Sequence, residues 1–199
     1  MVLDSDEGLL ERLRSGDEQA FVLLVRRHQP AMLRLARTFV PNVAVAEEVV
    51  QDTWLAVLRG VDRFEGRSAL RSWLFAILVN TARASGVRER RSVPIDDPGP
   101  AVDASRFDDA GHWRSAPEHW VEAAADRDRA AKIAARIRTA VTDLPARQAQ
   151  VVTLRDIEGL TSEQVCDLLE LSEGNQRVLL HRGRSRLRQI IEDEFGRAL

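Results

Sequence analysis

The 199-residue sequence contains a single cysteine, Cys166, and this scarcity excludes two classes of protein. One cysteine cannot form an intramolecular disulfide, so a small secreted fold held by disulfides is excluded, as is a zinc site built from several cysteines. No apolar run approaches the 18 or more residues that cross a bilayer, and the N-terminus is acidic where a signal peptide would be basic. We therefore expect a cytoplasmic protein that does not enter the membrane.

The chain is also too short for a large catalytic barrel. At about 150 residues per domain, it has room for one or two compact units. Hydrophobic residues make up 44% and charged residues 30%, as in a globular protein with a real core. Apolar residues recur at helical spacing and no segment has a convincing strand pattern, so we predict an all-α fold.

The formal net charge of −2 is small, but the charge is distributed unevenly. Residues 1–95 and 127–199 each carry two more basic than acidic groups, whereas residues 96–126 carry eight acidic and two basic groups. Within the two basic blocks, arginines cluster at 67–91 and again at 177–188. Two cationic patches are the electrostatic pattern of a protein that binds a polyanion at two places. The alternative is a pair of solvated helix faces, which is the commoner cause of any single charge run.

Four helices are predicted in the first block. A leucine stripe at 9–13 forms the first helix, and Asp17 caps a second one in which Pro30 marks a bend or a restart. A third helix over 44–59 places Val45, Val49 and Leu55 on its packed side. The fourth, over 69–90, has apolar residues at i, i+3, i+4, i+7 and i+8, and we assign Trp73 to the core.

Residues 92–121 are rich in proline, glycine and aspartate and have little periodicity, so they are predicted to link two domains. This segment repeats a His-Trp pair at 112–113 and 119–120. Two histidines without a cysteine or a suitably placed third ligand make a poor metal site. We favour a pair of aromatic anchors that bind one of the domains or a partner, formed by His112, Trp113, His119 and Trp120.

After the linker, helices are predicted over residues 121–141, 145–158, 161–169 and 173–194. Thr161 and Gln164 have capping-box spacing, and Ser172 offers a second N-cap after a short turn. Together they predict a helix-turn-helix, with Val165, Leu168 and Leu169 of the first helix and Val178 and either Leu179 or Leu180 of the second facing a core. Cys166 lies on the buried side of its helix, where we assign it to packing.

In a helix-turn-helix the second helix enters the major groove of DNA, with its N-terminal residues at the base edges. Those residues here are Asn175, Gln176 and Arg177, and amides and guanidinium groups can pair bidentately with adenine and guanine. The later arginines are better placed for phosphates. An ordinary helical hairpin with a basic end is the alternative, and we favour DNA binding because the caps, the apolar spacing and the reading residues agree.

The sequence resembles bacterial sigma factors of the sigma-70 family, and within this family it is most similar to the extracytoplasmic-function (ECF) group. The similar segments are AEEVVQDTW (46–54), FEG (64–66), LRSWL (70–74) and NTA (80–82) of region two, and LPARQ (144–148) and LSEGNQRVLLHRGR (171–184) of region four. The resemblance implies region two at 1–91, an acidic flexible linker at 92–121 and region four at 122–199.

The resemblance also implies three groups of site residues. The polymerase-docking group, which by itself could equally be a surface helix with one core tryptophan, is Glu47, Glu48, Gln51, Asp52 and Trp54. The group for recognising and melting the minus-ten element is Phe64, Gly66, Arg67, Arg71, Asn80, Arg83, Arg88, Arg90 and Arg91. The group for reading the minus-thirty-five element is Ser172, Gly174, Asn175, Gln176, Arg177, His181, Arg182, Arg184 and Arg186. The chain departs from the family at Gln176, which replaces a common small apolar residue, and at Leu179, which replaces a common arginine.

The partners that the resemblance implies are promoter DNA and core RNA polymerase, through its β′ clamp helices and β flap. An anti-sigma protein is a further partner usual in the family. We expect no cofactor, no metal and no enzymatic activity. One alternative is a helix-turn-helix regulator that acts without polymerase, whose N-terminal block would lack a docking face. Another is a magnesium-dependent nuclease that uses Glu47, Glu48 and Asp52, which we disfavour because carboxylates on one helix diverge and no lysine or histidine completes the site.

Overall fold

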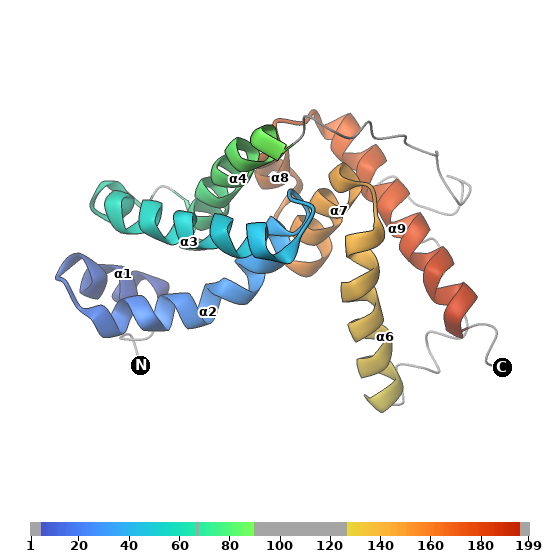
Figure 1. Cartoon of the computed structure of the whole chain (residues 1–199), viewed down its shortest axis with the longest axis horizontal. Helices are drawn as coiled ribbons and strands as arrows, with labels where there is room; N and C mark the ends of the chain where they lie inside the picture. Colours follow the sequence, from blue (N-terminus) through green and yellow to red (C-terminus); the bar gives the residue numbers. More distant parts are fainter. Residues whose placement is uncertain (1–4, 67, 90–126, 196–199) are drawn as a thin grey trace. The chain divides into compact units, whose positions relative to one another are not determined.

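The structure, a computed structural model, describes residues 5–66, 68–89 and 127–195. The chain divides into two compact units, residues 1–93 (unit 1) and residues 94–199 (unit 2), which are described separately below. Every secondary-structure element of the described residues is helical, so the predicted all-α class is confirmed (Figure 1). None of the described helices combines the length and the hydropathy that a bilayer crossing requires.

The described residues of unit 1 form four α-helices, α1 (Asp6–Arg14), α2 (Glu18–Ala36), α3 (Val43–Gly60) and α4 (Leu70–Glu89). A 3₁₀ turn, η2 (Val61–Arg63), follows α3. Helix α2 contacts each of the other three helices, and α3 packs along α4 (Figure 1).

Short polar residues begin the helices of unit 1, as local capping rules require. Asp17 accepts a hydrogen bond from the Gln19 amide at 2.9 Å, which confirms its predicted role as the cap of α2. Asn42 caps α3 in the same way, through the Val45 amide. Helix α2 runs through Pro30 without ending, so of the two predicted alternatives, a bend or a restart, the restart is wrong. Buried apolar residues on both sides of this proline hold the helix together and offset the lost backbone hydrogen bond.

Helix α3 is rotated slightly from the predicted orientation. Its buried residues are Ala46, Val49, Val50, Thr53, Trp54 and Val57. Leu55 is 50% exposed, so its assignment to the packed side was wrong. Neighbouring residues of a helix differ by about 100° in direction, and the large Trp54 ring takes the inward position that Leu55 was expected to fill.

Helix α4 contributes the densest part of the core of unit 1. The side chains that it buries are Leu70, Leu74, Phe75, Leu78, Val79 and Ala82. Trp73 is half-buried rather than fully in the core. One edge of its ring lies against Gly60, and the ring packs on Phe64.

Unit 2 contains α6 (Arg127–Ala140), the 3₁₀ turn η5 (Val141–Asp143), α7 (Ala146–Val152), α8 (Ser162–Leu169) and α9 (Glu173–Phe195). A π-helical segment, η6 (Thr153–Ile157), continues α7, so the helix predicted over 145–158 is present with a wider last turn. Helix α9 contacts α6, α7 and α8 and is the central helix of this unit (Figure 1).

Helices α7 and α9 approach each other closely at Gly183. A Cβ atom added there would lie 2.6 Å from a methyl group of Val152 and 3.5 Å from Gln148. Gln148 is itself buried, and its side-chain oxygen accepts a hydrogen bond from Arg186 at 2.9 Å. The absence of a side chain at Gly183 therefore sets the position of α9 on α7.

Candidate nucleic-acid and protein interfaces

The outer face of α3 combines carboxylates with exposed aliphatic side chains. Glu47, Glu48, Gln51 and Asp52 are all exposed. Beside them lies an apolar groove of about 380 Å³ between α2 and α3, which we call the α3 groove. Its lining residues are Phe21, Val25, Gln51, Trp54, Leu55 and Leu58.

Trp54 belongs to the floor of this groove and is only 6% exposed. Its ring meets Phe21 edge to face, with 5.7 Å between the ring centroids. The indole Nε1 atom is buried and donates to no acceptor among the described residues. Of the five residues predicted to dock polymerase, four are thus exposed at the surface and one lies beneath it.

The sequence interpretation missed the contribution of α2 to this surface. Phe21 and Val25 line the groove, and Val22 on the same helix is 40% exposed. The available signal was an apolar run from Phe21 to Val25, which is longer than one buried face of a helix needs.

The carboxylates of α3 do not converge on a metal position. Among the residues that the structure describes, no group of three histidine, cysteine, aspartate or glutamate side chains could hold a metal ion. The nuclease alternative therefore gains no support from this part of the chain.

The connection between η2 and α4 holds the first predicted minus-ten residues. Phe64 is half-buried, and its ring packs on Trp73 with centroids 4.8 Å apart and an interplanar angle of 41°. Gly66 is exposed and has a φ of +72°, which favours glycine. Asn80 is exposed two turns after Trp73, on the same face of α4.

The predicted minus-ten arginines fall into two groups. Arg71 places its guanidinium 5.4 Å from the centre of the Phe75 ring, and Arg83 is half-buried. The others have side chains outside the described residues: Arg67, Arg88, Arg90 and Arg91. The His-Trp pairs at 112–113 and 119–120 also lie outside them.

The predicted helix-turn-helix is present in unit 2. Both hydrogen bonds of the capping box are formed, from the Gln164 amide to Thr161 Oγ1 at 3.2 Å and from the Thr161 amide to Gln164 Oε1 at 2.9 Å. Helix α8 ends at Glu170, whose φ of 55° turns the chain sharply. Ser172 then accepts a hydrogen bond from the Asn175 amide at 3.3 Å at the start of α9.

The first turns of α9 expose Gly174, Asn175 and Arg177, as predicted for a reading helix. They also expose Val178, which is 47% accessible, so its assignment to the core was wrong. The inward position is taken by Leu180, one of the two alternatives predicted for it, whereas Leu179 is half-buried. Val178 thus adds an apolar side chain to the exposed surface at the start of α9.

Gln176 does not point outward. It is 3% exposed, and its Oε1 atom accepts a hydrogen bond from Ser162 Oγ of α8 at 3.0 Å. The expectation that this amide faces the bases was wrong, because its position on α9 faces α8.

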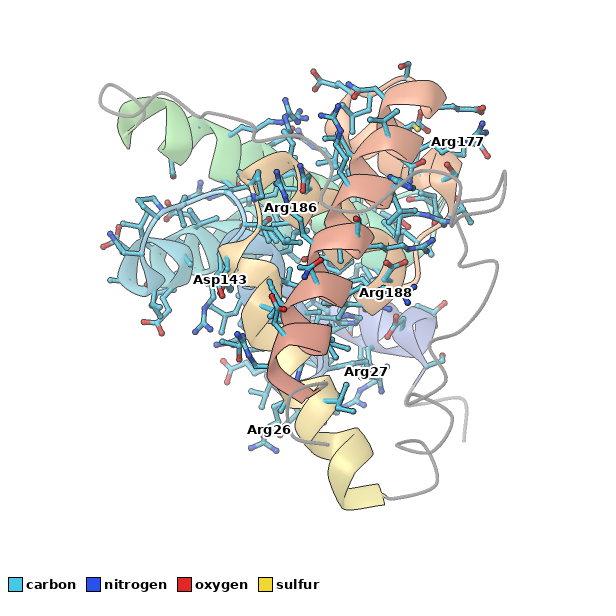
Figure 2. All side chains as sticks on the ribbon, turned by 90° about the vertical axis from the view of Figure 1, so that its right-hand side faces the viewer. Arg26, Arg27, Asp143, Arg177, Arg186 and Arg188 are labelled. Atoms are coloured by element: carbon cyan, nitrogen blue, oxygen red, sulfur yellow. The ribbon has the colours of Figure 1, made fainter. Side chains whose placement is uncertain are left out.

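The later arginines of α9 are bound within unit 2 to different extents. Arg184 makes two hydrogen bonds to the Asp156 carboxylate, at 2.9 and 2.7 Å, and Arg186 donates to Gln148. Arg182 is half-buried. The expected phosphate contacts of Arg184 and Arg186 therefore compete with partners inside the unit. Figure 2 shows Arg177 near the start of α9, and Arg186 and Arg188 further along the same helix.

His181 lies between these arginines and is half-buried. Burial lowers the pKa of His181, and the nearby Arg182 lowers it further. Both effects favour the neutral imidazole in the free chain.

The sequence matches two family models, "Sigma-70 region 2" over residues 24–92 and "Sigma-70, region 4" over residues 134–187. The ECF RNA polymerase sigma-E factor of Escherichia coli (strain K12) is 32% identical over 182 residues, which cover 90% of this chain and 91% of that protein. The sigma-E factor of Haemophilus influenzae is 29% identical over 188 residues, with coverages of 94% and 96%.

Two solved structures share the fold. One is CnrH in complex with the cytosolic domain of CnrY, with a TM-score of 0.54, 23% identity and coverages of 93% and 96%. The other is the sigma factor RpoE in complex with the anti-sigma factor NepR from Bartonella quintana, with a TM-score of 0.53, 21% identity and coverages of 86% and 96%. With both regions matched in order and a relative 32% identical over nine-tenths of its length, this chain belongs to the ECF family of RNA polymerase sigma factors.

Proposed function

We propose that this chain binds core RNA polymerase and directs transcription from specific promoters, with unit 1 docking polymerase and opening the minus-ten element and unit 2 reading the minus-thirty-five element. One observation carries the proposal: the same chain presents an apolar groove beside carboxylates in unit 1 and an exposed reading helix with a cationic side chain in unit 2. A regulator that bound DNA without polymerase would need only the second surface.

The α3 groove supplies the polymerase-docking surface in this proposal. Its apolar lining can bury aliphatic side chains of a partner helix, and the neighbouring Glu47, Glu48 and Asp52 select a partner with basic side chains around that apolar stripe. The β′ clamp helices of polymerase are the partner that the family implies.

Promoter opening requires no covalent chemistry, so we propose that the chain works through binding energy and not as an enzyme. The strands separate when a site holds unstacked bases more tightly than paired ones. Phe64 and Trp73 offer aromatic surface, Gly66 lets the backbone approach a base closely, and Asn80 offers hydrogen bonds. Neighbouring arginines would hold the phosphates of the separated strand.

In unit 2, Asn175 and Arg177 would read base edges in the major groove, and Val178 would contact a thymine methyl group. Ser172 and Gly174 place the first turn of α9 next to the DNA backbone, where its amides favour a phosphate. The β flap of polymerase would hold this unit near the upstream element.

The proposal places the chain in the cytoplasm, where polymerase and promoter DNA are. It also leaves room for control, because a protein that covered the α3 groove would keep the chain away from polymerase. The similar RpoE was solved in complex with an anti-sigma factor. We propose that an anti-sigma protein acts on this chain by such competition.

The decisive experiment is in-vitro transcription of fragmented genomic DNA from the source organism, with the 5′ ends of the RNA mapped by sequencing. Core polymerase with the chain should start at a defined set of sites that core polymerase alone does not use. The double variant Glu48→Lys/Asp52→Lys should weaken binding to core polymerase about tenfold or more, because two attractive charges become repulsive.

The matched control is Glu11→Lys/Glu18→Lys, which makes the same change in net charge with two exposed residues of α1 and α2 that do not line the groove. It should bind core polymerase as the wild type does. Equal affinity of all three proteins would contradict the docking surface, and the absence of any defined start site would contradict the proposed function.

A further inference from the structure

A single side chain of α1 reaches the connection that leads into α4. Arg14, the last residue of α1, donates from its Nε atom to the carbonyl oxygen of Val61 at 3.2 Å. Its Nη2 atom donates to the carbonyl oxygen of Phe64. One guanidinium thus connects α1 with two points of the main chain about fifty residues further along.

Val61 is the first residue of η2, and Phe64 is the residue that follows η2. The Val61 carbonyl also accepts the Phe64 amide at 3.2 Å, which closes the 3₁₀ turn. The guanidinium is a planar fork whose donors have fixed directions, so it can bind both carbonyls at once. A lysine ammonium at the same position is a point charge and cannot reproduce this geometry.

The opposite side of the same segment is held by α4. The Phe64 ring packs on Trp73, and Trp73 in turn lies against Gly60 at the end of α3. The chain between η2 and Gly66 is therefore fixed on two sides, by Arg14 through its backbone and by Trp73 through the Phe64 side chain.

Helix α1 provides a rigid base for Arg14. Leu9, Leu10 and Leu13 are buried. The Asp6 carboxylate pairs with Arg27 of α2 at 2.7 Å, and Arg12 pairs with Asp17 at 2.8 Å. The region 2 family model begins at residue 24, so α1 and Arg14 lie outside the matched segment.

We propose that α1 is a positioning element for promoter opening, and that Arg14 acts as a clip that fixes residues 61–66 in the conformation that selects a base of the separated minus-ten strand. The inference rests on the proposed function. Arg14 is a positioning residue that acts through the Val61 and Phe64 carbonyls. Its side chain is exposed, so replacing it leaves the core of unit 1 intact.

The test uses the full-length chain bound to core polymerase and a pool of single-stranded DNA oligonucleotides randomised at six positions. The bound fraction is sequenced, so that preference for each base is measured position by position. Arg14→Ala should reduce the preference for the favoured base about tenfold at one or two positions, because a charge-assisted pair of hydrogen bonds is lost. Affinity for core polymerase and the thermal unfolding midpoint should match the wild type.

Two further variants separate the clip from other roles. Arg14→Lys keeps the charge without the fork and should lose the same base preference as Arg14→Ala. Arg37→Ala removes an exposed arginine at the end of α2 and leaves α1 and its ion pairs unchanged, so it should keep the wild-type preference.

Retained preference in Arg14→Lys together with a loss in Arg14→Ala would overturn the inference, because a point charge would then be enough. Unchanged preference in both Arg14 variants would overturn it as well. A wild-type complex that binds the pool without any base preference would instead overturn the proposed minus-ten function, and the inference with it.

Discussion

Helix α3 of unit 1 and helix α9 of unit 2 each pack against other helices, but the side chains that they expose differ in charge. Helix α3 exposes Glu47, Glu48 and Asp52 beside Leu55 and Leu58, and no basic side chain lies between them. Helix α9 exposes Asn175 and Arg177 in its first turns. The overall charge of −2 therefore describes neither surface.

The arginines of the two units differ as well. In unit 1, Arg14 donates to main-chain carbonyls of the predicted minus-ten segment. In unit 2, Arg184 and Arg186 bind Asp156 and Gln148 and join α9 to the preceding helical segment. Some arginines of an arginine-rich run thus hold helices together. Only the contacts of each side chain within the fold show which arginines could bind DNA.

The largest expected effect concerns the close packing of α7 and α9 in unit 2. Gly183→Ala should lower the free energy of unfolding of unit 2 by about 1–3 kcal/mol, because the new methyl group overlaps Val152, which is fully buried. Cys166 is the only thiol of the chain, and burial raises its pKa, so a thiol reagent labels it when unit 2 opens. Its labelling rate should rise about tenfold or more.

The control for this prediction is Gly174→Ala, because a Cβ atom at that position of α9 meets no atom within 4 Å. This variant should be as stable as the wild type or slightly more stable, since alanine favours a helix. The fluorescence measurements here and below use the background Trp113→Phe/Trp120→Phe, which leaves Trp54 and Trp73 of unit 1 as the emitting tryptophans. In this background all three proteins should show the same transition. Slow labelling of Gly183→Ala would contradict the packing argument.

The second prediction separates reading arginines from structural ones. Arg177→Ala should cost about 1–3 kcal/mol of binding free energy and relax preference at one base pair of the upstream element. The guanidinium of Arg184 is paired with Asp156 and is not free to read a base. Arg184→Ala should therefore keep the base preference, and any loss of binding should be equal for all sequences. Selection of duplex DNA from a randomised pool by the complex with core polymerase measures both. A uniform loss for Arg177→Ala would mean that it contacts phosphate.

The elements of this fold could be predicted from sequence where their causes are local. The cap at Asp17, the capping box of Thr161 and Gln164 and the cap at Ser172 each need only a few neighbouring residues, and all three are present. The helical spacing of apolar residues likewise gave the all-α class.

The direction of individual side chains could not be predicted in the same way. Leu55, Gln176 and Val178 were each assigned to the wrong side of a helix, because adjacent residues differ by about 100° and the inward direction depends on where another helix lies. The pairing of Arg184 with Asp156 joins residues 28 positions apart, and no local pattern indicates it.

The third prediction concerns the stability of unit 1 at acid pH. Burial lowers the pKa of His28 below the usual 6.5, and the positive charges of Arg27 and Arg71 act in the same direction, while the Asp6 carboxylate at 3.5 Å opposes them. Below about pH 6.5 the unfolded chain binds a proton at this histidine before the folded chain does, so stability falls as the pH decreases towards the lowered pKa.

The slope from this one group cannot exceed about 1.4 kcal/mol per pH unit, the value for one proton. Urea unfolding followed by tryptophan fluorescence between pH 5.5 and 8 measures it in unit 1. His28→Gln removes the titrating group and should flatten the profile over this range. An equally steep profile in the variant would assign the acid sensitivity to other groups.

The smallest expected effect contrasts the turns of the two units. Unit 1 places Gly16 at a φ of +84° after α1, whereas unit 2 ends α8 with Glu170 at a φ of +55°, where a side chain is strained. Glu170→Gly should therefore stabilise unit 2 by about 0.5–1 kcal/mol, and Gly16→Ala should destabilise unit 1 by a similar amount. Cys166 labelling measures the first change and tryptophan fluorescence the second. Faster labelling of Glu170→Gly would show that the glutamate side chain contributes more to the turn than its backbone conformation costs.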